Sequence, residues 1–339
     1  MAQRREWILE LTPAHLAELT AAAEPYVALS TTGETAAGAL AQLDPASFRL
    51  PTLGPLLASV REELLHGRSF ALLRGLPVDR LSRLQSAAMF LGIGAHLGRA
   101  RSQNAKGHVL GHVFDLGLRG DDPNVRIYQT SQRQTFHTDS SDVVGLLCLR
   151  EAKRGGASLL VSALSIYNAM REECPELLAR LLLPMPHDRR GEVPAGMKPY
   201  FEIPVYSWFA NQLTVFYQRQ YFDSAQRFPA ARPLSNEDVR ALDRFDAIAN
   251  DPRLNLPMRL LPGDMQFVHN HNILHDRTGF EDWPEPQRKR HLLRLWLAVP
   301  GARPLPESFA ARYGTVEIGN RGGIIVPGAT RLTVPLEPE

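Results

Sequence analysis

The sequence has 339 residues, of which 22% are charged and 44% hydrophobic, a composition typical of a globular protein built as one large domain or two small ones. Lys and Arg total 38 and Asp and Glu total 36, so net charge gives no support to a nucleic-acid or membrane-surface partner. The two cysteines, Cys148 and Cys174, exclude a disulfide framework and favour a reducing compartment.

We expect neither a signal peptide nor a membrane-spanning helix. The N-terminus is basic, but it lacks the apolar segment that a signal peptide requires. No stretch approaches the roughly 20 consecutive apolar residues of a membrane-spanning helix. We therefore expect a cytoplasmic protein that acts without a membrane or a nucleic acid.

The N-terminal part, residues 1–68, is predicted to be helical. Thr12 is a good helix cap and Pro13 suits the first helical position, so one helix should begin here. The helical spacing of apolar residues over 53–65 predicts a second helix, which the glycine at Gly67 would end.

Strands and helices then alternate along the chain. Short apolar runs between turn residues predict strands, and apolar residues spaced three or four apart predict helices. In chain order we expect a connector over 29–50, a strand over 69–74, a helix over 79–97, strands over 125–129, 143–149 and 157–161, a helical stretch over 163–184, strand-like alternation over 204–217 and a helix over 235–250.

Two stretches lack a regular period. Residues 185–204 are rich in proline, which predicts a loop or lid over a site. Residues 301–339 are rich in proline and glycine and predict a C-terminal extension with short strand-like pieces such as Gly323–Pro327.

The chain shows neither an internal repeat nor a low-complexity linker. We therefore expect a single domain over 1–339, with a core over about 69–300 between the helical N-terminal part and the C-terminal extension. Strands interrupted by helices favour an α+β, mainly β, architecture, in which a jelly-roll barrel carries flanking helices.

The first candidate site is His137 and Asp139. Residues two apart on a strand point to the same face, so these side chains could bind one ion while Thr138 points away. A further histidine would complete two His and one carboxylate on one side of an octahedron, the arrangement of non-haem Fe(II) oxygenases. One such triplet is a weak signal by itself, but it precedes an apolar strand and a histidine cluster lies downstream.

That downstream cluster holds His269, His271 and His275. We expect His275 to be the third ligand of the site with His137 and Asp139. We expect His269 and His271 to be hydrogen-bonded or rim histidines. A zinc hydrolase site built from the three clustered histidines alone is the alternative.

Arg290 and Arg294 lie on a strand-like run whose alternate positions are apolar. The apolar face must be buried, so the arginine face either meets water or lines a pocket. A guanidinium group can bind a carboxylate through two parallel hydrogen bonds, so this run is a candidate site for an acidic ligand. A solvated basic strand edge is the other interpretation.

Four motifs resemble the TauD/TfdA family of Fe(II)- and 2-oxoglutarate-dependent dioxygenases, a clavaminate synthase-like group. They occur in the family's order over about residues 69–299. The motifs are Phe136–Asp142, Gly155–Ser158, Asn270 with His275, and Arg290 with Arg294.

The resemblance implies a double-stranded β-helix core that binds iron through His137, Asp139 and His275. It also implies that Arg290 binds the distal carboxylate of 2-oxoglutarate. Ser158 stands where the family usually has a threonine that assists that carboxylate. Arg294 matches a family arginine near the carboxylate of the substrate or of 2-oxoglutarate.

The implied reaction consumes O2 and 2-oxoglutarate, releases succinate and CO2, and oxidises a C–H bond of a small-molecule substrate. The intact carboxylate at Asp139 favours hydroxylation over halogenation, and desaturation and ring formation stay open. The family resemblance is compatible with a homo-oligomer. Two alternatives remain: a non-catalytic jelly-roll sensor that binds a metal or small acid, and the zinc hydrolase.

Overall fold

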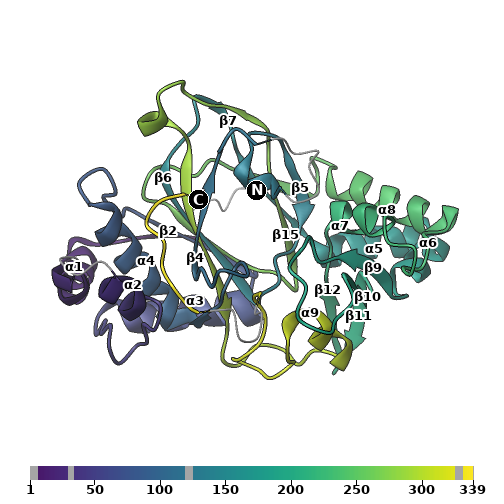
Figure 1. Cartoon of the computed structure of the whole chain (residues 1–339), viewed down its shortest axis with the longest axis horizontal. Helices are drawn as coiled ribbons and strands as arrows, with labels where there is room; N and C mark the ends of the chain where they lie inside the picture. Colours follow the sequence, from purple (N-terminus) through teal and green to yellow (C-terminus); the bar gives the residue numbers. More distant parts are fainter. Residues whose placement is uncertain (1–6, 30–33, 119–124, 325–330, 339) are drawn as a thin grey trace.

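The computed structural model describes residues 7–29, 34–118, 125–324 and 331–338 as a mixed α+β protein with several sheets (Figure 1). The helices are α1 (Pro13–Ala28), α2 (Glu34–Leu40), α3 (Leu53–His66), α4 (Arg83–Leu97), α5 (Ala163–Glu173), α6 (Pro175–Leu181), α7 (Arg219–Ala225), α8 (Asn236–Ala249) and α9 (Ala310–Tyr313). Short 3-10 helices lie at Ile127–Gln129, Pro286–Arg288 and Glu307–Phe309. None of the helices in this described part is long and apolar enough to cross a membrane.

The large sheet combines strands that are far apart in the sequence, and most of its strand pairs are antiparallel. Its strands, in spatial order, are β1 (Ile8–Glu10), β2 (Phe70–Arg74), β14 (Met265–His269), β6 (Val143–Arg150), β17 (His291–Ala298) and β3 (Arg99–Ala100), with β4 (Leu110–Phe114) also paired to β17.

A second sheet carries β13 (Asn255–Met258), β8 (Ser158–Ser162), β15 (Ile273–Arg277) and β5 (Gln134–His137) in that order. Three smaller two-stranded sheets pair β9 (Met185–Asp188) with β10 (Tyr200–Ile203), β11 (Tyr206–Phe209) with β12 (Gln212–Val215), and β7 (Arg154–Gly155) with β16 (Phe280–Glu281).

The large sheet and the second sheet pack against each other. One buried cluster takes Val144, Val268 and Trp296 from the large sheet and Leu160 and Ile273 from the second. In Figure 1, helices α1 to α4 lie outside the large sheet, and α5 to α8 lie on the opposite side of the molecule, beyond β15 and β5. The space between the two sheets is therefore the interior of the protein.

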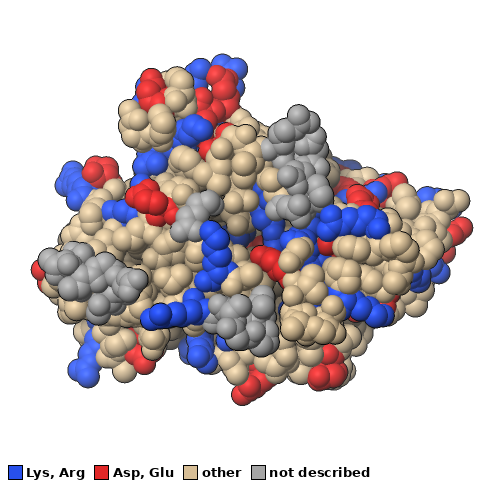
Figure 2. All heavy atoms as spheres, viewed as in Figure 1, with Lys and Arg blue, Asp and Glu red and all other residues tan. Residues whose placement is uncertain are grey.

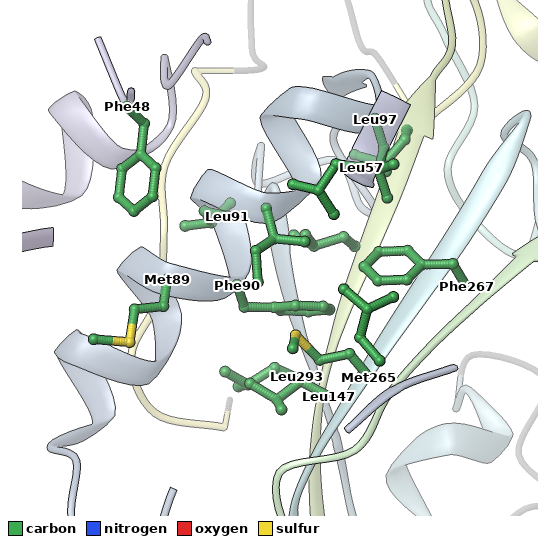
Figure 3. Packing of buried hydrophobic residues seen from close by; sticks show 14 of the residues in the cluster. Phe48, Leu57, Met89, Phe90, Leu91, Leu97, Leu147, Met265, Phe267 and Leu293 are labelled. Carbon is green, nitrogen blue, oxygen red and sulfur yellow. The ribbon is translucent and has the colours of Figure 1, made fainter. Parts of the chain in front are cut away.

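The outer face of the large sheet forms the main core with the N-terminal helices (Figure 3). Leu293, Leu295 and Leu297 alternate along β17 and point into this core. Phe90 of α4 meets Phe267 of β14, with ring centroids 6.1 Å apart. Because side chains on a strand alternate between faces, Leu292, Arg294 and Trp296 of β17 point toward the second sheet.

Several predicted elements are confirmed where a local signal marks them. Helix α1 begins at Pro13, and the side chain of Thr12 accepts a hydrogen bond from the backbone of His15. Helix α3 ends before Gly67, and α8 begins after Ser235, whose hydroxyl accepts a bond from the backbone of Asp238. These signals act within one turn of the chain, so they can be recognised from the sequence.

Other predicted elements were wrong or misplaced. The strand expected over 125–129 is a 3-10 helix, because five alternating residues do not distinguish a strand from a turn. The helix expected from residue 79 begins at Arg83, after a cap at Ser82, and the connector over 29–50 contains α2. The proline-rich loop over 185–204 contains β9 and β10, a two-stranded ribbon that has no central strand for proline to disrupt.

The C-terminal extension is packed against the protein rather than trailing from it. Phe309 and Tyr313 are buried with Phe216, and Val334 joins the main core. The strand-like piece Gly323–Pro327 is described only as far as Ile324, which has no strand partner; its remaining residues lie outside the described part of the chain.

His187 on β9 is buried, and we expect it to make the stability of the fold sensitive to acid. Its ring stacks on Phe201, and burial lowers its pKa from 6.5 to about 3. Below about pH 6.5 the unfolded chain binds a proton that the folded chain rejects, so stability falls with pH toward 3. We expect this residue to remove about 1 kcal/mol of unfolding free energy between pH 6.5 and about 5.5.

Urea unfolding at the two pH values measures that loss. The variant His187→Phe keeps an aromatic ring in the same apolar site and cannot titrate. Between the two pH values, the unfolding free energy of His187→Phe should fall by about 1 kcal/mol less than that of the wild type. Equal losses in the two proteins would show that His187 does not cause the acid sensitivity.

Candidate active site

Strand pairing brings together two motifs that are far apart in the sequence. His137 on β5 lies opposite His275 on β15, and their ring centroids are 4.1 Å apart. Asp139 lies just beyond the end of β5, where its backbone N–H donates to the Oδ1 of Asn270 at 3.0 Å. Asn270 also donates to the carbonyl oxygen of Ser141, so its side chain holds the Asp139 segment beside the turn between β14 and β15.

His137, Asp139 and His275 form a compact, buried group. Each offers one ligand atom, and these atoms all lie within 4.8 Å of one another. The Nε2 of His275 lies 3.7 Å from the Oδ2 of Asp139. Neither that oxygen nor the Nδ1 of His275 has a hydrogen-bond partner in the described structure, which is costly for buried polar atoms unless a further group binds them.

Electrostatics keep this group in a metal-binding protonation state. Burial lowers the pKa of His137, and it lowers the pKa of His275 to about 3, so both rings are neutral near pH 7. Burial alone would raise the pKa of Asp139, but the charge of Arg294, with the two histidines, outweighs it and leaves this pKa below its ordinary value.

The tautomer of His137 is also set. Its Nδ1–H donates to the carbonyl oxygen of Thr135 at 2.8 Å, so its Nε2 carries a lone pair, which faces the side-chain amide of Gln134 at 2.9 Å. Two neutral imidazoles and one carboxylate are the donor set of a facial non-haem iron site. Among the residues that the structure describes, this is the one group of His, Cys, Asp and Glu close enough to hold a metal ion.

A cavity on one side of this group is lined by the buried, positively charged side chain of Arg290. Its polar lining residues are Gln134, His137, Ser158, His275, Asp276, Arg277, Arg290 and Arg294, and the others are apolar. Arg290 is 5% exposed, and its Nη1 has no hydrogen-bond partner among the described residues. Burial lowers its pKa to about 10, so it stays protonated near pH 7. The arginine face of β17 therefore lines a pocket rather than a solvated edge.

The glycine motif before Ser158 fits around Arg290. Gly156 has φ +73°, and a Cβ there would lie 2.9 Å from the Nε of Arg290, so only glycine allows the guanidinium group this close. The hydroxyl of Ser158 donates to the Oε1 of Gln266 at 3.1 Å and lines the same cavity. Both features are on the path from β7 to β8.

Arg294 stands beside the carboxylate of the group. Its Nε donates to the Oε1 of Gln103 at 2.7 Å, and its Nη1 lies 3.7 Å from the Oδ1 of Asp139. The guanidinium group also lies 4.6 Å from the ring centroid of Tyr128. Arg294 lines both the Arg290 cavity and a second cavity, which Asp139 also lines.

The three clustered histidines do not form a site, so the zinc hydrolase alternative is wrong for the described structure. His269 ends β14 in the large sheet, whereas His275 lies on β15 in the second sheet, and the turn between these strands separates the two side chains. His271 is hydrogen-bonded to Asp142 at 3.0 Å, as expected of a structural histidine. His269 is buried and has no hydrogen-bond partner among the described residues.

The sequence analysis missed several cavity arginines. Arg277 lines the Arg290 cavity, its Nε and Nη1 lack partners in the described structure, and burial lowers its pKa to about 9. It is two residues after His275 on the same strand, so the two-residue period could have identified it. Arg126, Arg190 and Arg312 line the second cavity, and they come from segments with no recognisable motif.

The chain is similar to several known proteins. A family model described as taurine catabolism dioxygenase TauD, TfdA family, matches residues 35–296. The FR-33289 synthase of Streptomyces rubellomurinus is 35% identical over 276 residues, which cover 80% of this chain and 81% of that protein. The taurine hydroxylase-like protein SAT17 of Stachybotrys chartarum is 32% identical over 277 residues, which cover 76% and 70%.

Solved structures share the fold at lower identity. An asparagine oxygenase in complex with Fe(II), hydroxyasparagine and succinate superposes with a TM-score of 0.64 at 20% identity, covering 86% of this chain and 93% of that chain. The non-haem iron oxygenase OrfP, in complex with Fe and alpha-ketoglutaric acid, gives a TM-score of 0.63 at 19% identity with the same coverage. Another OrfP structure holds succinate and (3S)-hydroxy-L-Arg.

Proposed function

This chain belongs to the TauD/TfdA family of Fe(II)- and 2-oxoglutarate-dependent dioxygenases, and from that membership we propose that His137, Asp139 and His275 bind its iron. The observation that carries the proposal is the buried His–Asp–His group, in which the Oδ2 of Asp139 has no hydrogen-bond partner, beside a cavity lined by Arg290, which has no carboxylate partner among the described residues. Its donor set fits iron, and Fe(II) and 2-oxoglutarate are the cofactor and cosubstrate of the family.

The chemistry that bound iron supplies is the oxidative decarboxylation of 2-oxoglutarate to succinate and CO2, coupled to insertion of one oxygen atom of O2 into a substrate C–H bond. The residues of the chain position the reactants for it. Leu146, Leu260 and Leu292 form apolar walls of the Arg290 cavity and limit the access of water. Asp139 keeps a carboxylate where halogenation would need room for a halide, so hydroxylation is the proposed outcome.

Arg290 is proposed to bind the distal carboxylate of 2-oxoglutarate. Its guanidinium group is buried, remains protonated and has no carboxylate partner among the described residues, so an acidic ligand would relieve the cost of its burial. Ser158 is proposed to assist, because its hydroxyl lies on the wall of the same cavity. Arg294 is proposed to keep Asp139 ionised and to contact the carboxylate of the substrate or of 2-oxoglutarate.

We further propose that the two facing sheets form a double-stranded β-helix. Their shared buried cluster and the likeness to the asparagine oxygenase support this arrangement. A single domain is supported by the large sheet, which takes strands from Ile8–Glu10 through His291–Ala298, and by the C-terminal Val334 in the main core. The substrate is proposed to be a small molecule, as in the oxygenases whose structures contain hydroxylated amino acids.

Anaerobic calorimetry tests the role of Arg290. We expect 2-oxoglutarate to bind the full chain in the presence of Mn(II), a redox-inert substitute for Fe(II), and to bind poorly without it. In Arg290→Ala the loss of two charge-assisted hydrogen bonds, about 1.5 to 3 kcal/mol each, should raise the Kd for 2-oxoglutarate by a factor on the order of 100 or more.

Two controls make the result specific. Mn(II) affinity in Arg290→Ala should stay unchanged, because Arg290 is not a proposed metal ligand. The matched variant Arg253→Ala, which removes an 86% exposed arginine side chain, should bind 2-oxoglutarate like the wild type. An unchanged Kd in Arg290→Ala would assign the cosubstrate carboxylate to another cation.

A further inference from the structure

The second cavity beside Asp139 is rich in arginine. Thr138, Asp139 and Ser140 form one wall, so the cavity opens directly on the proposed metal ligand. Its other walls carry four guanidinium groups, those of Arg126, Arg190, Arg294 and Arg312. Figure 2 shows Lys and Arg side chains gathered around the middle of the face that Figure 1 presents.

Arg312 is a buried cation without a counter-charge. It lies on α9, is 7% exposed, and its Nε donates to the hydroxyl of Ser140 at 2.8 Å. Ser140 follows Asp139, so this contact sets the guanidinium group next to the metal segment. No carboxylate of the described residues lies within salt-bridge distance of Arg312.

Arg190 is a second, half-buried cation of this cavity. Its backbone has φ +54°, in the left-handed region, and its N–H donates to the Oδ1 of Asp188 at 2.7 Å, which fixes this unfavourable conformation. Its Nη2 donates to the carbonyl oxygen of Val125 at 2.9 Å, whereas its buried Nε has no partner in the described structure. Its side chain likewise forms no ion pair with a described carboxylate.

The other two arginines of the cavity are compensated. Arg126 is paired with Glu192 and donates to the hydroxyl of Tyr221, and Arg294 lies near Asp139. Neither Arg190 nor Arg312 forms an ion pair with a described carboxylate, and the nearby carboxylates of Asp188 and Glu192 act on them without direct contact between the charged groups. An unpaired buried charge is strongly destabilising, so Arg312, together with the buried Nε of Arg190, points to an anionic ligand in this cavity.

We propose that the primary substrate carries a phosphoryl dianion, as a phosphate monoester or a phosphonate, and that this group binds between Arg190 and Arg312. A carboxylate or sulfonate brings one negative charge. A phosphate monoester brings about 1.5 to 2 near pH 7, and an alkylphosphonate, whose second pKa is higher, gains its second charge beside two guanidinium groups; both offer three acceptor oxygens. The inference rests on the proposed function. If Asp139 binds the iron, a phosphoryl group in this cavity would hold the carbon atoms of the same substrate molecule near the metal.

Binding of small probes tests this proposal without turnover. The full chain, loaded with Mn(II) and 2-oxoglutarate under anaerobic conditions, is titrated by calorimetry with methylphosphonate, methyl phosphate and methanesulfonate. We expect both phosphoryl probes to bind at least tenfold more tightly than methanesulfonate, and the tighter of the two indicates whether the substrate is a phosphonate or a phosphate ester. Affinity for methyl phosphate should fall below about pH 6, where the probe loses its second charge.

Variants connect the binding to the two arginines. Arg190→Gln and Arg312→Gln should each weaken the phosphoryl probes at least tenfold, which is about 1.4 kcal/mol. The exposed control Arg253→Gln should leave them unchanged. Because a cation without a partner costs stability, each cavity variant should unfold at the same temperature as the wild type or higher without probe, and should lose the upward shift that methylphosphonate gives.

Two results would overturn the inference: phosphoryl probes that bind no better than methanesulfonate, or binding that both glutamine variants retain. The Mn(II) and 2-oxoglutarate titrations in the same samples report on the proposed function separately. Normal metal and cosubstrate binding without probe binding rejects only the phosphoryl site. Probe binding to a chain that fails to bind Mn(II) rejects the iron site and keeps the anion site.

Discussion

Replacing Asp139 or His275 with alanine is expected to abolish succinate formation while the chain stays folded. Each variant removes one of three proposed protein ligands from a site whose metal supplies several kcal/mol of catalysis, so turnover should fall by roughly a thousandfold or more. The loss of stability should be smaller in His275→Ala, where the Nδ1 has no hydrogen-bond partner in the described structure to lose, than in Asp139→Ala, which removes the carboxylate beside the buried Arg294. Loss of activity without loss of fold would identify the iron site.

The measurement has three parts. Succinate is quantified after reconstitution with Fe(II), metal content is determined after anaerobic loading, and circular dichroism checks the fold. His66→Ala, which removes a histidine side chain that is 62% exposed on α3, is the matched control and should behave like the wild type. Turnover near the wild-type rate in either Asp139→Ala or His275→Ala would exclude that residue as a ligand.

Asp142→Ala is expected to have the largest effect on stability. The Oδ1 of Asp142 accepts hydrogen bonds from Arg321 at 2.8 Å and from His271 at 3.0 Å, and its Oδ2 accepts one from the backbone of Val299. Arg321 is fully buried, so removing the carboxylate leaves a charge with no counter-ion. Breaking a buried pair in this way costs about 3 to 5 kcal/mol.

Urea unfolding followed by circular dichroism measures this cost. Arg321→Met should cost a similar amount, because it leaves Asp142 buried without its cation. Arg253→Ala breaks an exposed pair with Asp251 and should cost less than about 1 kcal/mol. If Asp142→Ala lost no more stability than this surface variant, the network would not be holding the C-terminal extension to the metal segment.

The same network gives Asp142→Ala a second expected effect. Asp142 is three residues after Asp139, and the N–H of Asn270 donates to its carbonyl oxygen. Loosening this segment should weaken metal binding as well as folding. Metal affinity that stays at the wild-type level in a destabilised Asp142→Ala would show that the two functions are independent.

The sequence by itself determined the elements whose signals are local. Thr12, Ser235 and Gly67 mark helix ends through contacts within one turn, and the apolar run at Val143–Leu149 marks a buried strand. The motif residues His137, Asp139 and His275 were also selected from the sequence, because a family resemblance fixes their order along the chain. Local patterns failed over 125–129, where a short period fits more than one backbone conformation, and over 185–204, where proline content hid a two-stranded ribbon.

Only the tertiary structure decided which of these residues meet and what surrounds them. Strand register places His137 opposite His275 and leaves His269 on another sheet, and register depends on the pairing of segments distant in the chain. The ion pair of Arg321 with Asp142, and the lack of ion pairs between described carboxylates and Arg190 or Arg312, likewise depend on how distant segments pack. Burial and charge balance belong to the folded molecule as a whole, and no local pattern of residues encodes them.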